Sequence, residues 1–418
     1  MRSFATVTVA ALSLLSGALA HPGEDHDNGR ITVARDLAAA HAREIMAKCS
    51  GTAPHAALQA RSAARRALTA QLLREERDIA YKPLTTGKRD TVSALEKWMG
   101  KCHDHSSHDS AYNASTPEAT IFTSNATHAL TPENIVGPYY VKGELLRRNI
   151  TEDQAGVPVH LDIQFIDITT CQPVPNLLVD VWQANATGVY SGVVASGGLN
   201  TTFLRGFQIS DHEGVVEFDT LYPGHYFGRT QHIHVITRRG GTVLPNNTYT
   251  GGTVNHIGQL YFDQELSNEV ETMAPYLYNY MPVTYNSEDI WTAEAASAEY
   301  DPFLDYVKLS DDANDGLLMW ITIGINGTAD YENQATAAAT WQKDGGVAAP
   351  MPAFPFPFPP RNVSNGTFPV GNGTFPGFNG TFPFNGTEFP GGTFPGFGGP
   401  KKGGKTPKPW GPCENEHR

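Results

Sequence analysis

The chain has few cysteines, no Cys-x-x-Cys pair and no long apolar run after its first 20 residues. Only four cysteines occur in 418 residues, and the absence of Cys-x-x-Cys pairs excludes a zinc ribbon. The formal net charge of −13 argues against nucleic acid or an anionic membrane as a partner. No later apolar segment reaches the length of a membrane-spanning helix. We therefore expect neither a nucleic-acid nor a membrane partner.

Residues 1–20 have the pattern of a secretory signal peptide. Arg2 precedes an apolar stretch, and the segment ends in Ala18-Leu19-Ala20. It is too short for a membrane anchor, so we expect a soluble, extracellular mature protein. Asn-x-Ser/Thr sequons, which accept glycans when they are exposed on a secreted protein, agree with this expectation. They begin at Asn113, Asn125, Asn149, Asn185, Asn200, Asn246, Asn326, Asn362, Asn365, Asn372, Asn379 and Asn385.

The four cysteines allow two disulfides in three pairings. Cys49 with Cys102 is the natural local pair. Cys171 lies at a turn between predicted strands and is then left to pair with Cys413. The sequence does not decide between the pairings.

Residues 21–119 differ in composition from the rest of the chain. The stretch from Val33 to Ala80 is rich in Ala, Arg and Glu, which favours helix. Lys88-Arg89 is a dibasic pair of the kind that processing proteases cut. The region up to residue 89 is therefore either a pro-segment or a helical cap that stays attached. Residues 102–115 then have the composition of a polar linker.

Residues 120–345 predict an all-β fold. Short strands separated by turn signals are typical of a β-sandwich. Asp211 to Gly214 is expected to form a hairpin turn, and residues 285–310 are helix-like with Ser287 as cap. The predicted strands are 159–167, 177–184, 207–210, 215–220, 232–237, 258–263 and 317–325.

Residues 346–418 form a Pro/Gly/Phe-rich tail with repeated Asn-Gly-Thr-Phe-Pro units. Frequent proline blocks both helix and sheet pairing, so we expect a disordered, glycosylated tail.

The run from Pro223 to Val235 contains the most informative residues. His232 and His234 are one residue apart in a β-branched stretch, so on a strand both imidazoles project from one face. Tyr226 lies six residues earlier, and Tyr190 adds a second phenol. Imidazole suits iron, copper and zinc, whereas a phenolate oxygen favours a trivalent ion.

These residues stand in blocks that resemble the intradiol ring-cleavage dioxygenases. The blocks are VDVWQANATGVYSG, RGFQISDHEGVVEFDTLYPGHYFGRTQHIHV and GQLYFD, preceded by IVGPYY. The chain is similar to the secreted, fungal-type members and to the catalytic domains of catechol 1,2-dioxygenase and protocatechuate 3,4-dioxygenase. The resemblance covers roughly residues 120–345. It implies an Fe(III) enzyme that inserts both atoms of O2 and opens a catechol between its hydroxyl-bearing carbons to a muconate-type diacid.

The resemblance also implies roles for individual residues. The Fe(III) ligands would be Tyr190, Tyr226, His232 and His234. Catalytic roles fall to Tyr226 as the phenolate displaced by substrate, to Arg229 as a fixed positive charge and to Gln259. The substrate pocket would include Pro138, Tyr139 and Tyr140. Because Asn185 lies so close to Tyr190, we expect it to be buried and unmodified.

Two departures from the family pattern bear on assembly. The stretch between Tyr226 and His232 is short, and the N-terminal helices do not resemble the dimerisation element of bacterial members. Both favour an open site and a monomer.

Other interpretations remain open. One is a non-catalytic sandwich module that binds a partner. Another is a copper monooxygenase, in which His21 at the mature N-terminus would bind the metal. Cys102, His103, His105 and His108 could also bind a metal adventitiously.

Overall fold

The computed structural model describes two large sheets and the helix that covers one of them. The described residues are 49, 52–79, 94–101, 103–104, 135–296, 300–342 and 345–349. The predicted signal peptide, His21, the Lys88-Arg89 pair and the tail beyond Ala349 lie outside them. In the part of the chain that is described, no helix is both long and apolar enough to cross a membrane.

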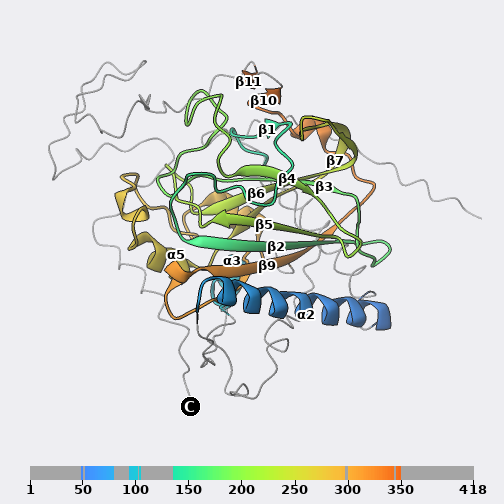
Figure 1. Cartoon of the computed structure of the whole chain (residues 1–418), viewed down its shortest axis with the longest axis horizontal. Helices are drawn as coiled ribbons and strands as arrows, with labels where there is room; N and C mark the ends of the chain where they lie inside the picture. Colours follow the sequence, from blue (N-terminus) through green and yellow to red (C-terminus); the bar gives the residue numbers. More distant parts are fainter. Residues whose placement is uncertain are drawn as a thin grey trace, which may run out of the picture.

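Two four-stranded sheets form the body of the molecule (Figure 1). The first has the order β5-β2-β9-β8, in which only β2 and β9 run parallel. The second has the order β4-β3-β6-β7 and is antiparallel throughout. A small third sheet has the order β1-β10-β11. The strands are β1 Val141–Lys142, β2 Pro158–Asp167, β3 Leu178–Trp182, β4 Arg205–Ile209, β5 Val215–Leu221, β6 His232–Val243, β7 Tyr249–Tyr261, β8 Asp305–Lys308, β9 Leu317–Ile325, β10 Ala339–Gln342 and β11 Gly345–Ala348.

The main core lies between the two large sheets. Leu161 and Ile163 of β2 share one buried cluster with Ile233 and Val235 of β6. Side chains alternate along each strand, so the inner faces supply this core and the outer faces need separate cover. The predicted all-β sandwich with a helical N-terminal segment is confirmed.

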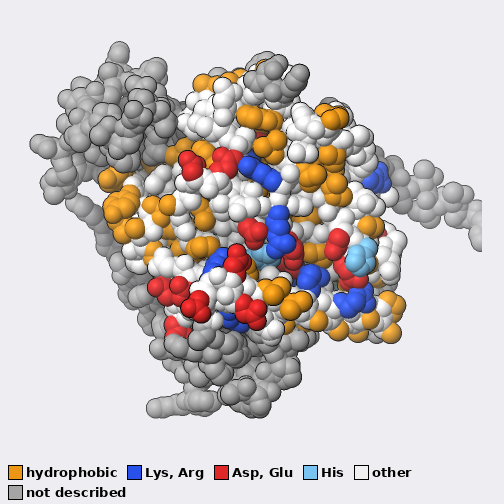
Figure 2. Space-filling view, viewed as in Figure 1, with side chains coloured by type: hydrophobic (Ala, Val, Ile, Leu, Met, Phe, Trp, Pro, Cys, Tyr) orange, Lys and Arg blue, Asp and Glu red, His pale blue; other side chains and the backbone are white. Residues whose placement is uncertain are grey.

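Helix α2 (Ala53–Glu76) covers the outer face of the first sheet (Figure 1). Thr52 caps its first turn, and its small residues pack against Trp320 of β9. Arg65 donates two hydrogen bonds to the buried Asp162 of β2, at 2.9 and 3.0 Å. Figure 2 shows acidic and basic side chains intermingled along α2 and just above it. Helix α2 therefore covers the outer face of the first sheet as a cap.

A disulfide joins this cap to the sandwich, and it corrects both pairings considered from sequence. Cys49 is bonded to Cys171, at a sequence separation of 122 and with 5.4 Å between their Cα atoms. Neither Cys49–Cys102 nor Cys171–Cys413 is formed. Cys102 and Cys413 lie outside the described residues. The local pairing was wrong because the packing of α2 on the first sheet brings Cys49 to the turn after β2.

The segment predicted as one helix over 285–310 is mostly not helical. It contains α6 (Ile290–Ala295) and then β8, and the cap of α6 is Asp289 rather than Ser287. The Asp289 carboxylate accepts a hydrogen bond from Trp291 N at 2.9 Å. The remaining helices are α3 Ala94–Met99, α5 Gln264–Glu271, η2 Tyr276–Tyr278, η3 Ala313–Asp315 and η4 Glu332–Gln334.

The turn at Asp211–Gly214 does not make a hairpin. The turn itself is present, since Gly214 N donates to Asp211 O at 3.0 Å. However, β4 joins the second sheet and β5 joins the first, so the turn connects the two sheets. The hairpin prediction was wrong because a local turn signal does not say which strand each arm pairs with.

His103 belongs to the folded unit, although its segment was predicted to be a polar linker. It is buried, with Nδ1 2.5 Å from Asp263 Oδ1 and Nε2 2.9 Å from Asp301 Oδ2. Burial favours the neutral imidazole, but the two carboxylates outweigh it and raise the pKa of His103 to about 10. The chain just before the sandwich is thus fixed to it by a buried ion pair.

Candidate metal centre

Two histidines of β6 face the outer side of the second sheet. Ile233 between them points into the core, and strand alternation directs His232 and His234 the other way, as predicted. Both rings are buried, and their Nε2 atoms lie 3.1 Å apart.

Two tight turns bring the phenols to the same place. Tyr226 and Arg229 close a four-residue turn, in which Arg229 N donates to Tyr226 O at 3.0 Å. Tyr190 ends the loop after β3. This loop lies against the Tyr226 turn at Gly188, where an added Cβ would be 2.4 Å from the His225 carbonyl oxygen and φ is +77°. Only glycine suits such an approach at that backbone angle.

The four predicted ligands meet at His232. Its Nε2 lies 3.5 Å from Tyr190 Oη, 3.4 Å from Tyr226 Oη and 3.1 Å from His234 Nε2. Donors about 2.0–2.1 Å from one metal ion lie about 2.8–3.6 Å from each other at angles of about 90–120°. The observed separations match this spacing, so the side chains fit a single metal ion.

The protonation states also suit a cation. Burial and the nearby Arg229 lower the pKa of both His232 and His234 well below its usual value. His232 Nδ1 donates to Thr230 O at 2.7 Å, which leaves the Nε2 lone pair facing the site. Burial raises the pKa of Tyr190 and of Tyr226, so ionised phenols require a neighbouring positive charge.

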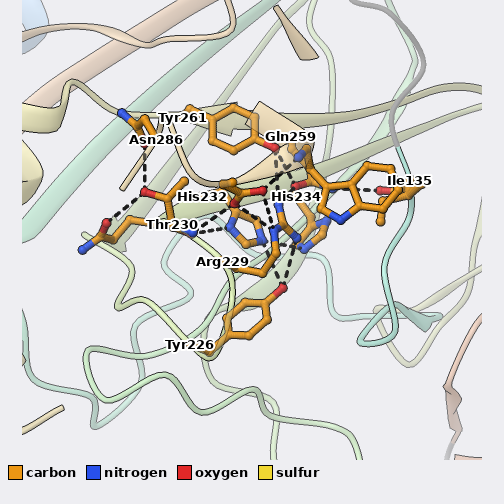
Figure 3. Close-up of polar contacts among 12 residues, drawn as sticks. Ile135, Tyr226, Arg229, Thr230, His232, His234, Gln259, Tyr261 and Asn286 are labelled. Atoms are coloured by element: carbon orange, nitrogen blue, oxygen red, sulfur yellow. Dashed lines mark hydrogen bonds and ion pairs between the residues drawn. The ribbon is translucent and has the colours of Figure 1, made fainter. Parts of the chain in front are cut away.

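Arg229 lies beside the phenols and is held on three sides (Figure 3). Its Nη1 donates to Tyr226 Oη at 3.2 Å, and its Nη2 donates to Gln259 Oε1 at 2.5 Å. Its Nε donates to both oxygens of Asp289, at 2.9 and 3.1 Å. Burial opposes the charge, but Asp289 and the hydroxyls of Tyr226 and Tyr261 raise the pKa of Arg229 above its ordinary value. The site therefore contains a permanent, oriented positive charge.

Gln259 lies opposite His234 in the pairing of β6 with β7. Its amide nitrogen donates to Ile135 O at 3.1 Å, and its oxygen accepts from Arg229 and from Tyr261 Oη. Gln259 thus ties the segment that begins at Ile135 to the guanidinium (Figure 3).

Of the three predicted pocket residues, Tyr139 borders the four donors, whereas Tyr140 points away from them. The Tyr139 ring stacks on Tyr190 at 4.4 Å and meets Tyr226 edge-on at 5.8 Å, so it borders the site. Tyr140 instead packs on Trp182, and its hydroxyl is 3.0 Å from Tyr249 Oη, away from the four donors. Pro138 is half-buried between Tyr139 and Gly137 in the same turn.

Asn185 is half-buried rather than buried as expected. Its Nδ2 donates to Gln154 Oε1 at 2.9 Å, and its Oδ1 accepts from the backbone of Thr187 and Val189. The amide that a glycan would modify is therefore already engaged. The prediction erred because the loop before Tyr190 runs near the surface before it turns inward.

The alternative metal clusters receive no support from the described residues. Among them, no group of three or more His, Cys, Asp or Glu side chains could hold a metal ion. His103 uses both ring nitrogens on Asp263 and Asp301. Cys102, His105 and His108 lie outside the described residues, as does His21 of the copper alternative.

Sequence reasoning missed several residues that shape the site. Trp182 stacks on His234, with ring centroids 4.8 Å apart. Thr230 holds His232 through its carbonyl oxygen, and Asp289 holds Arg229. Trp182 and Thr230 carried a signal, because they stand in the same blocks as Tyr190 and His232. Asp289 comes from a distant, irregular segment whose position depends on the fold.

A family comparison agrees with this geometry. Residues 135–241 match the family model described as Dioxygenase. The predicted resemblance to a dioxygenase family is confirmed over this segment. It contains Tyr190, Tyr226, Arg229 and both histidines, whereas Gln259 and Asp289 lie beyond it. No curated protein matches the chain by sequence.

Solved structures similar to the chain include three dioxygenases. The intradiol ring-cleavage dioxygenase of Tetranychus urticae is 27% identical over 49% of this chain and 98% of that one, with a TM-score of 0.42. The dioxygenase domain of a carbohydrate-binding fusion from Streptomyces sp. SirexAA-E is 25% identical over 47% and 97%, with a TM-score of 0.31. Catechol 1,2-dioxygenase from Acinetobacter sp. ADP1, inhibited by bound mercury, is 22% identical over 47% and 62%, with a TM-score of 0.32. Because these TM-scores are below 0.5, the interpretation of the site depends on the family match and on the four side chains.

Proposed function

We propose that this protein is an Fe(III) intradiol dioxygenase that opens catechol-type aromatics between their hydroxyl-bearing carbons to muconate-type diacids. One observation carries the proposal: Tyr190, Tyr226, His232 and His234 direct two phenol oxygens and two imidazole nitrogens at one point. Two neutral imidazoles and two phenols are a ligand set for a hard trivalent cation. When bound, Fe(III) supplies the charge that ionises the phenols and the redox chemistry that O2 insertion requires.

The two phenols are not equivalent, and this difference supports different roles for them. Tyr190 is buried and stacked on Tyr139, so it is held in place. Tyr226 is half-buried, and its hydroxyl already accepts a hydrogen bond from Arg229. Tyr226 would therefore be the phenol that yields its place to a catechol, with its Oη available to take up a substrate proton. His232 and His234, fixed on β6, stay in position.

Arg229 supplies fixed positive charge next to the departing phenol. A guanidinium stays protonated throughout the working pH range. Its Nη1 is directed at the oxygen of Tyr226, where the catecholate oxygens would arrive. A fixed charge there stabilises the negative charge that develops on the substrate without reorganisation.

We further propose that the protein is secreted and acts as a monomer. The signal-like residues 1–20 and the Cys49–Cys171 disulfide support an oxidising compartment. Helix α2 packs on its own chain's first sheet, so this helix does not offer its buried face to a second copy. The candidate substrates are catechol, protocatechuate, hydroxyquinol and lignin-derived catechols.

The proposal is tested on the purified full-length protein. We expect about one iron per chain, a visible band from ferric tyrosinate, and acyclic muconic acids as the products from a panel of catechols. Mass spectrometry of the products distinguishes these diacids from yellow hydroxymuconic semialdehydes. A colourless protein without iron would support the non-catalytic module, and semialdehyde products would contradict the assignment of cleavage position.

A further inference from the structure

We propose that Asp289 is a positioning residue that fixes both the charge beside the metal centre and one of its imidazole ligands. This inference rests on the proposed function and adds a residue from outside the family-matched segment. Asp289 is 1% exposed and precedes α6, far in sequence from the residues of the centre.

Asp289 positions the charge through its contacts with Arg229. Both carboxylate oxygens of Asp289 accept from Arg229 Nε, at 2.9 and 3.1 Å. Gln259 holds the far end of the guanidinium at Nη2. Because the guanidinium is planar, fixing Nε and Nη2 determines the direction of Nη1, which donates to Tyr226 Oη. Asp289 thus aims the group that faces the displaced phenol.

Asp289 also positions His232, through the backbone of Thr230. Asp289 Oδ2 accepts from Thr230 N at 3.0 Å, and Thr230 O accepts from His232 Nδ1 at 2.7 Å. A hydrogen bond on one ring nitrogen fixes the tautomer and orientation of an imidazole ligand. The position of the peptide unit that holds His232 therefore depends on the carboxylate of Asp289.

Asp289 is itself well anchored. Its Oδ1 accepts from Trp291 N as the cap of α6, so three donors surround the buried carboxylate. Thr230 Oγ1 lies 2.8 Å from Asn286 Oδ1, which joins the same two segments a second time (Figure 3). The Tyr226–His232 stretch is thus held in place by the segment around Asp289, which lies 60 residues later in the sequence than Arg229.

The test compares three full-length variants with the wild type. Asp289→Asn keeps the shape but removes the charge. Asp289→Ser keeps a good helix cap but is too short to reach Arg229. Asp162→Asn is the matched control, because Asp162 is also a buried carboxylate paired with arginine but lies under α2 on the first sheet.

We expect both Asp289 variants to shift the visible band, to weaken iron affinity in chelator competition by about 10–100-fold and to lower kcat more than they raise KM. Asp162→Asn should lower the melting temperature but leave the band and kcat per bound iron unchanged. Asp289 variants that lose only melting temperature, like the control, would overturn the inference and leave the proposed function standing. A wild-type protein that binds no iron and cleaves no catechol would overturn both.

Discussion

Trp182 lies flat against His234, with ring centroids 4.8 Å apart and planes 3° from parallel. The two residues are direct neighbours across β3 and β6. His234 Nδ1 has no hydrogen-bond partner among the described residues, so packing rather than hydrogen bonding orients this ring. His232, by contrast, is oriented by its bond to Thr230 O. The two imidazoles should therefore respond to different kinds of mutation.

Gly137→Ala should disturb His234 and weaken iron binding. An added Cβ would lie 2.9 Å from His234 Cε1, which is too close. The ring has little room to shift, because Trp182 is stacked on it. Gly240→Ala is the control, since its φ of +73° nearly equals the +74° of Gly137 but nothing lies within 4 Å. The left-handed backbone costs both variants about 1–2 kcal/mol. We expect only Gly137→Ala to lose iron at equal chelator concentration, and equal loss in both would contradict the steric explanation.

Substitution of the four ligands should give two distinct results. Tyr190→Phe and Tyr226→Phe each remove a phenolate, so the visible band should weaken or shift while some iron remains. His232→Ala and His234→Ala should lose the metal. Tyr222→Phe removes a buried phenol that contacts Ser267 in the core and should change neither iron content nor spectrum. Any of the four that matches this control is not a ligand.

The ion pair of His103 should make stability fall at alkaline pH. Its folded pKa of about 10 lies above the unfolded value of 6.5, so the contribution is complete below pH 6.5 and is lost as pH rises toward 10. Within that window the slope is at most about 1.4 kcal/mol per pH unit. Urea unfolding at several pH values should show wild type and His103→Gln differing most near pH 6 and converging near pH 10. The exposed His212→Gln should follow the wild type, and a pH-independent gap for His103→Gln would contradict the ion pair.

Removing the Cys49–Cys171 disulfide should destabilise the protein without removing its iron. The bond closes a long loop, and its loss costs about 2–4 kcal/mol in the free energy of unfolding. Cys49→Ser, Cys171→Ser and the double variant should lose the same amount, because each breaks one bond. The first sheet and the core separate this bond from the metal centre, so iron per folded chain should not change. Non-reducing peptide mapping that links Cys171 to Cys413 would contradict the pairing.

Much of the fold and the centre could be predicted from local sequence patterns. Alternation along residues 232–237 was enough to place His232 and His234 on one face and Ile233 in the core, because side-chain direction on a strand depends only on its period of two. The strands around residues 159–167 and 317–325 were found for the same reason. The blocks that carry Tyr190 and Tyr226 were visible because they are contiguous.

Three of the errors have a common cause, which is contact between distant segments. The turn at Asp211–Gly214 was recognised, but its two arms joined different sheets. Cys49 met Cys171 rather than a nearer cysteine, because α2 had to cover the outer face of the first sheet. His103 entered the fold because Asp263 and Asp301 were already buried there.

The sequence by itself determined the kinds of donor atom at the centre and the face of β6 on which two of them stand. Only the tertiary structure decided which residues hold the centre in place. Asp289 binds Arg229, Thr230 accepts a hydrogen bond from His232, and Trp182 stacks on His234. Periodicity and turn chemistry act over a few residues, so they can be read along the chain. The supports come from segments up to 60 residues apart, and their contacts are set by the packing of the two sheets and the loops that join them.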